Sequence, residues 1–109
     1  MSLIKNFFKQ TRILDGGMGQ ELLNRGVIPH GTIWGATALL HKKYHKLLVK
    51  THLDFIKAGA EVIVTNSFGS RKRRLIENKL GHKFKELNEL AGKLARDAVK
   101  KSKKNILIA

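Results

Sequence analysis

Two polar segments of the sequence each follow a short apolar run and contain residue types that suit ligand binding. The first, residues 15–19, reads Asp-Gly-Gly-Met-Gly, and the second, residues 65–68, reads Thr-Asn-Ser-Phe. Glycines at such a turn permit positive φ angles and let a ligand approach backbone amides closely. Free N–H groups at the start of a following helix attract an anion. Asp15, Gly16 and Gly17 are therefore candidates for a clamp that holds the ammonium and the carboxylate of an amino acid.

Other interpretations of these segments stay open or fail on a single residue. A dinucleotide-binding motif needs a third glycine at position 22, where Leu22 stands, and the Gly-Lys-Ser/Thr of a phosphate-binding loop is absent. Asp15 could instead only cap the following helix, with the glycines forming a turn. Asn66 could orient a substrate, hold a neighbouring loop, or only satisfy the backbone of its own turn.

The histidines and the single tryptophan offer weaker candidates. His41, His45 and His52 are spaced by four and then seven residues, so one helical face can carry all three. No Glu follows His41 as in the helical zinc-protease motif, and the chain contains no cysteine. We expect no metal on this helix, with His41 and His45 in solvent and His52 packed or hydrogen-bonded. Trp34 could pack over the mouth of a barrel or anchor its loop, and we expect the anchor.

The polar segments alternate with stretches that predict strands and helices. Short apolar or β-branched runs predict buried strands at residues 12–15, 61–66 and 105–109. Apolar residues three and four apart predict helices at 20–25, 36–58, 70–79 and 83–101, with a C-cap glycine at Gly59. The order β-α-β-α-β is typical of parallel strands with right-handed crossovers, either in an open doubly wound sheet or in a closed barrel. Both architectures bind ligands at the carboxyl ends of the strands, where Asp15 and Asn66 stand.

The composition is that of a small domain with a large positive charge. The 109 residues carry a formal charge of +14 and are 42% hydrophobic, with no signal peptide and no run long enough to span a bilayer. We therefore expect a cytoplasmic protein. The basic clusters at residues 71–74 and 100–104 have no interleaved aromatic residues, which favours a solvated surface over a nucleic-acid site. A small basic module that binds nucleic acid or an acidic partner without catalysis is the alternative function.

Four segments together resemble, in order and spacing, the N-terminal part of the homocysteine S-methyltransferase family. They are residues 13–19, 33–36, 52–68 and 87–96, and the resemblance extends from Arg12 to Ala109. It implies that residues 1–109 are the N-terminal β-α-β-α-β part of a (β/α)8 TIM barrel, incomplete in this chain because such barrels need about 250 residues. We expect the remainder of the barrel beyond Ala109; a truncated gene with an inactive product is the alternative. Alone, the segment would keep unpaired strand edges and fold poorly or self-associate.

The resemblance also implies an activity, namely transfer of a methyl group to the sulfur of homocysteine to form methionine. The Asp-Gly-Gly strand end of the family contacts the amino-acid part of homocysteine and falls on Asp15, Gly16 and Gly17; Asn66 falls on its Thr-Asn strand end. The family holds a catalytic zinc that lowers the thiol pKa, through cysteines of later strands that this chain lacks.

The resemblance therefore implies that this segment holds the amino-acid-binding half of the active site and lacks the half that activates the sulfur. The segment would bind homocysteine but, by itself, would be inactive because it cannot activate the sulfur. The methyl donor, which the sequence leaves undetermined, would be S-methylmethionine, S-adenosylmethionine, betaine or methyl-cobalamin. A different barrel enzyme that binds an anionic metabolite at the glycine turn is a further alternative.

Overall fold

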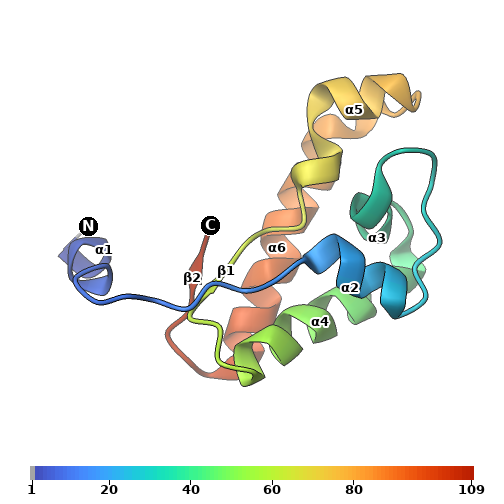
Figure 1. Cartoon of the computed structure of the whole chain (residues 1–109). Coiled ribbons are helices and arrows are strands. Elements are labelled where there is room, and N and C mark those ends of the chain that lie inside the picture. Colours follow the sequence, from blue (N-terminus) through green and yellow to red (C-terminus); the bar gives the residue numbers. More distant parts are fainter. Residues whose placement is uncertain (1) are drawn as a thin grey trace.

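The computed structural model describes residues 2–109 and contains short strands separated by helices (Figure 1). The α-helices are α1 (Ser2–Phe7), α2 (Met18–Asn24), α3 (Thr37–Leu40), α4 (His45–Lys57), α5 (Lys72–Glu77) and α6 (Phe84–Ser102). The strands are β1 (Val62–Ile63) and β2 (Leu107–Ile108). Single 3-10 turns precede four of the helices: η1 (Trp34–Ala36), η2 (Lys42–Tyr44), η3 (Phe68–Ser70) and η4 (Gly81–Lys83).

The strands are parallel and follow one another in sequence order. Val62 of β1 pairs with Leu107 of β2, and on its other side Val62 forms a parallel bridge with Leu14. The expected β-α-β-α-β order is confirmed, although the regular ladder is shorter than the predicted strands. Backbone hydrogen bonds extend it, because Thr65 N–H donates to the Ala109 carbonyl at 2.9 Å. The sheet described here does not itself show a closed barrel.

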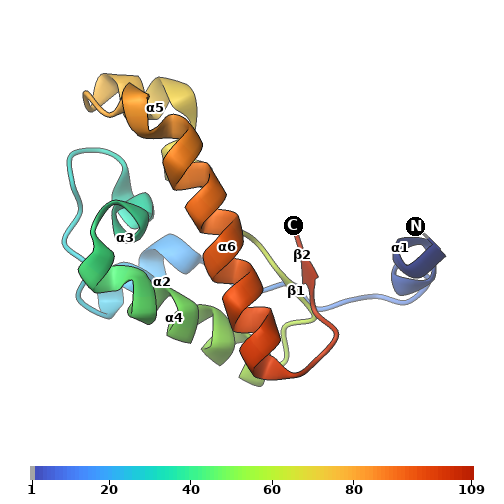
Figure 2. The ribbon, with the colours of Figure 1, turned by 180° about the vertical axis from the view of Figure 1, so that it is seen from behind.

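Helices α4 and α6 pack against each other and bury the apolar side chains that their spacing predicts (Figures 1 and 2). Ile56 of α4, Ala95 of α6 and Ile63 of β1 form one cluster and are at most 1% exposed. The small Ala95 lets the helices approach closely. Burial of a side chain such as Ile56 contributes about 1.5–3 kcal/mol, so this contact holds the crossovers on the strands.

The prediction of one helix across residues 36–58 is wrong, because the chain breaks at His41. His41 is extended, with φ −106° and ψ 118°, so α3 ends at Leu40 and α4 begins at His45. At the break the His45 Nε2–H donates to the Leu39 carbonyl at 2.9 Å, which gives a partner to a carbonyl at the end of α3. Apolar spacing continues across the break, and for this reason the pattern hides it.

The other helices agree with the sequence more closely. Helix α6 spans Phe84–Ser102 against the predicted 83–101, and α2 starts two residues before its predicted beginning. The segment predicted as one helix at 70–79 begins as η3 and becomes α-helical only at Lys72. Gly59, with φ +118°, follows α4 as a C-cap glycine should.

Exposed apolar side chains gather on the strand segments and the loops that leave them. Ile13 and Leu14 are each 58% exposed, Val64 is 40% exposed and Phe68 is 83% exposed.

Within residues 2–109, no helix has the length and apolarity needed to cross a bilayer.

Candidate functional site

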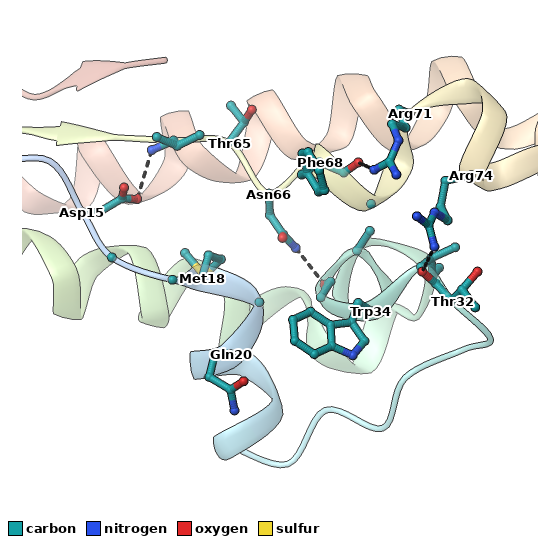
Figure 3. A pocket seen from close by; sticks show the side chains of 18 of the residues that line it. Asp15, Met18, Gln20, Thr32, Trp34, Thr65, Asn66, Phe68, Arg71 and Arg74 are labelled. Atoms are coloured by element: carbon teal, nitrogen blue, oxygen red, sulfur yellow. Dashed lines mark hydrogen bonds between the residues drawn. The ribbon is translucent and has the colours of Figure 1, made fainter.

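A cavity of about 830 Å³ lies at the carboxyl ends of residues 12–15 and β1 (Figure 3). This is the edge at which parallel sheets bind their ligands. Its lining includes all four residues predicted from the sequence: Asp15, Gly16, Gly17 and Asn66. The fold therefore brings the two polar segments, which are about fifty residues apart in the chain, to one cavity.

Asp15 joins the two strand ends. Its N–H donates to the Val62 carbonyl at 3.0 Å, and its Oδ2 accepts a hydrogen bond from Val64 N–H at 3.0 Å. Partial burial raises the pKa of the Asp15 carboxyl, and hydrogen bonds from the Val64 and Asp15 amides oppose that rise. A cation beside the carboxylate would offset the cost of burying it. The alternative that Asp15 caps α2 is wrong, because the N-cap is Gly17 and no side chain caps this helix.

The glycines of the turn provide space rather than positive φ angles. Gly17 has φ −71°, and among the described glycines the positive angles belong to Gly26, Gly31 and Gly59 instead. A Cβ atom on Gly16 would lie 3.0 Å from Cε1 of Phe55. No hydrogen bond within residues 2–109 uses the N–H of Gly16 or Gly17, so both amides are open to a ligand.

Asn66 holds the neighbouring loop against the strand end. Its side chain is buried, and its Nδ2–H donates to the Gly35 carbonyl at 2.9 Å. Gly35 in turn packs backbone to backbone on α2, because a Cβ atom there would lie 2.7 Å from the Cα of Gly19. Of the three predicted roles, the structure shows the loop-holding one, and the wall of the cavity depends on it.

Trp34 lines the cavity instead of being buried as an anchor. The residue has φ +54° and is 53% exposed, and a Cβ atom on Gly19 would lie 3.6 Å from Cε3 of its ring. Figure 3 shows the Trp34 side chain at the cavity. A bulky residue in the left-handed region costs about 1–3 kcal/mol and persists only where its surroundings impose it. The contact with Gly19 fits the expected anchor in part, while the exposed ring faces the site.

Two arginines at the cavity were missed in the sequence, where they appeared only as surface charge. Arg71 Nη1 donates to the Phe68 carbonyl at 2.9 Å, and its guanidinium lies 4.5 Å from the centroid of the Phe68 ring. Arg74 Nη1 donates to the Thr32 carbonyl at 3.3 Å. Arg74 lies within α5, whereas Arg71 is the extended residue that precedes this helix, so helical spacing in the sequence does not separate the two from Arg73.

The histidines do not form a metal site. His52 is fully buried and neither of its ring nitrogens has a hydrogen-bond partner, so it is packed, as expected. His41 is exposed as predicted, whereas the prediction for His45 is wrong because it is half-buried and bonded to Leu39. Residues 2–109 contain no group of three His, Cys, Asp or Glu that could hold a metal ion. With no cysteine in the sequence, the residues present do not fit a zinc site.

The two basic clusters do not form one continuous surface. Residues 71–74 begin α5, beside the N-terminal end of α6, and residues 100–104 surround its C-terminal end (Figure 1). The length of α6, which has 19 residues, separates the clusters.

The sequence of the chain is similar to one protein family and to individual members of it. A sequence model described as homocysteine S-methyltransferase matches residues 12–109. Homocysteine S-methyltransferase 2 of Saccharomyces cerevisiae is 27% identical over 94 residues, which cover 79% of this chain and 29% of the yeast protein. Homocysteine S-methyltransferase 4 of Zea mays is 39% identical over 56 residues, or 51% of this chain and 16% of the maize protein.

A solved structure shows the same arrangement. The metallated form of the homocysteine methyltransferase MmuM from Escherichia coli superposes with a TM-score of 0.75 at 28% identity, covering 99% of this chain and 38% of that one. The chain therefore spans less than two-fifths of the relatives described here. The match over residues 12–109, with the strand-end cavity in place, shows that this chain belongs to the homocysteine S-methyltransferase family.

Proposed function

We propose that this chain forms the amino-acid-binding part of a homocysteine S-methyltransferase barrel, in which the complete protein transfers a methyl group to the sulfur of homocysteine. The observation that supports this most strongly is the meeting of Asp15, Gly16, Gly17 and Asn66 at one cavity in a chain of this family.

In this proposal the turn holds both charged groups of homocysteine. The Asp15 carboxylate pairs with the ammonium, and the N–H groups of Gly16 and Gly17 donate to the carboxylate of the substrate. The raised pKa of Asp15 supports this pairing, because burial disfavours its charged form until a cation is close. Asn66 keeps the loop of Gly35 in place and so maintains the shape of the cavity.

Sulfur activation is not assigned to these residues. A zinc ion in the complete family enzyme would lower the pKa of the thiol. Because the described residues do not fit a zinc site, the proposal gives this chain binding and orientation of the amino acid and no step at the sulfur.

Titration of the 109-residue chain with L-homocysteine, followed by the amide shifts of the glycine turn in NMR spectra, tests the proposal. Because the sequence predicts that the segment alone folds poorly or self-associates, amide dispersion and sedimentation first establish a folded monomer. A chain that fails this check is tested within the complete barrel protein. Asp15→Asn keeps an oxygen that can accept from Val64 N–H but loses the charge. We expect it to weaken binding by about tenfold or more, the typical loss for a hydrogen bond to a charged group. Asp97→Asn is the matched control and should leave binding unchanged, because Asp97 of α6 is 41% exposed, pairs with Lys93 and does not line the cavity.

One analogue of homocysteine locates the contact with the ammonium group. 4-Mercaptobutanoate lacks the ammonium group, so it should bind the wild-type chain and the Asp15→Asn variant equally. Equal affinity of L-homocysteine for the wild-type chain and the Asp15→Asn variant would contradict the assignment of Asp15.

A further inference from the structure

We propose that Arg71 and Arg74 form an anion-binding rim of the cavity, which recognises the carboxylate of the methyl donor. The inference rests on the proposed function, since it assigns a second ligand to the same cavity. It concerns the end of the cavity formed by η3 and the start of α5, and not the glycine turn.

The two guanidinium groups are positioned by the backbone around them. Arg71 donates to the Phe68 carbonyl and lies over the Phe68 ring, while Arg74 donates to the Thr32 carbonyl. Each of these hydrogen bonds uses one N–H of a group that has five. Both side chains line the cavity, and each keeps further N–H groups that can donate to a ligand (Figure 3).

No carboxylate of the described residues neutralises these two charges. The ion pairs within residues 2–109 include Arg73 with Glu77 on the same helix, but they do not include Arg71 or Arg74. Arginine presents a planar fork that matches a carboxylate or a phosphate with two parallel hydrogen bonds. A rim with two such forks and no internal counter-ion is suited to an anionic ligand group.

The position of the rim separates it from the amino-acid clamp. Asp15 lies at one end of the cavity and the arginines lie at the other, with Asn66, Trp34 and Phe68 between them (Figure 3). In the proposed function, the carboxylate of homocysteine is already held at Gly16 and Gly17. The free cationic end therefore suits the second reactant, whose carboxylate would fix its position across the cavity.

Binding of three carboxylate-bearing donors to the 109-residue chain tests this inference. S-methyl-L-methionine, S-adenosylmethionine and betaine are titrated separately, with inorganic phosphate as a probe for a bare anion. Arg71→Gln and Arg74→Gln should each weaken a donor that binds by about tenfold or more. Arg73→Gln is the matched control, because Arg73 has the same charge on the same helix, is 91% exposed and does not line the cavity.

The outcomes separate this inference from the proposed function. Homocysteine binding that survives Arg71→Gln and Arg74→Gln, with donor binding lost, supports the rim. The assignment is overturned if no donor binds in an arginine-dependent way, or if Arg73→Gln lowers donor affinity as much as Arg71→Gln and Arg74→Gln do. It is also overturned if phosphate alone binds as tightly as every donor, or if the arginine variants lower the affinity for homocysteine as much as the affinity for the donor. A chain that binds a donor through the arginines but ignores homocysteine would refute the proposed function and leave the rim standing.

A second pair of variants guards against loss of folding. Arg71→Lys and Arg74→Lys keep the charge but lose the fork, so donor affinity should fall between the values for the wild-type and glutamine variants. Amide NMR spectra that keep the wild-type dispersion show that the fold is retained.

Discussion

Protonation of His52 should make the folded chain sensitive to mild acid. His52 lies fully buried on α4, neither ring nitrogen has a hydrogen-bond partner, and burial lowers its pKa from 6.5 to about 4. In the unfolded chain the imidazole takes up a proton near pH 6.5, whereas the folded chain resists until about pH 4. The stability that the neutral His52 contributes is therefore fully present above pH 6.5 and is lost as the pH falls towards 4.

The size of the loss follows from the two pKa values. At 1.36 kcal/mol per pKa unit, the interval from 6.5 to about 4 corresponds to about 3 kcal/mol of unfolding free energy in full. About 2 kcal/mol of this should already be gone at pH 5. The lowered pKa values of Asp54 and Glu61 add losses of their own as the pH falls, and the raised pKa of Asp15 acts in the opposite direction. The contribution of His52 is therefore obtained from the difference between the wild-type chain and a variant that lacks this imidazole.

Urea unfolding at pH 7.5 and at pH 5, followed by circular dichroism, measures the effect. His52→Leu fills a similar volume without a titrating group, so its loss of stability between pH 7.5 and pH 5 should be about 2 kcal/mol smaller than that of the wild-type chain. His41→Leu, at an exposed position, is the control and should keep the wild-type pH dependence. Equal pH dependence in the wild-type chain and the His52→Leu variant would refute the reasoning.

Three further substitutions test packing and charge by the same urea measurement. Gly35→Ala should destabilise the chain by about 1–3 kcal/mol, because the new Cβ would lie 2.7 Å from the Gly19 Cα; a neutral effect would mean that the loop can move away. Gly92→Ala, inside α6 and close only to a flexible side chain, should instead stabilise by about 0.5–1 kcal/mol, and a loss would contradict this. Arg25→Gln removes the 2.9 Å ion pair with Glu21 and the 2.8 Å ion pair with Asp54, so it should cost up to about 1 kcal/mol at low salt, and an effect that persists in 1 M salt would argue against a Coulombic origin.

The order of the elements could be predicted from the sequence because each strand is a short apolar run between glycines or polar residues. Helix α6 was located within one residue, since its buried Leu87, Ala91, Leu94 and Ala98 recur at three- and four-residue intervals. The break at His41 could not be predicted in the same way. Apolar periodicity records which side chains face the core, and it is nearly unchanged when a helix is interrupted by one extended residue.

The lining of the cavity was predictable only in part. Asp15 and Asn66 could be predicted because polar residues after buried strands converge at one edge of a parallel sheet. Arg71 and Arg74 belong to a run of four basic residues, and charge alone does not reveal which members face inward. The distinction depends on where α5 begins, which is set by tertiary contacts such as the hydrogen bond from Ser70 Oγ to Asn88 Oδ1 at 3.1 Å.

Structural and binding roles at this site share the same side chains. Asp15 uses Oδ2 to accept from Val64 N–H, and Asn66 uses Nδ2 to donate to the Gly35 carbonyl. In the proposed function, a ligand would meet Oδ1 of Asn66 and the carboxylate of Asp15, which also receives hydrogen bonds from the Val64 and Asp15 amides. Two acceptors facing one cavity suit a group with several N–H donors and a positive charge, which is the property of an amino-acid ammonium. The sequence presents bracing and binding as alternatives for these residues, whereas the geometry allows one atom of each side chain to brace the fold and the other to remain available to the ligand.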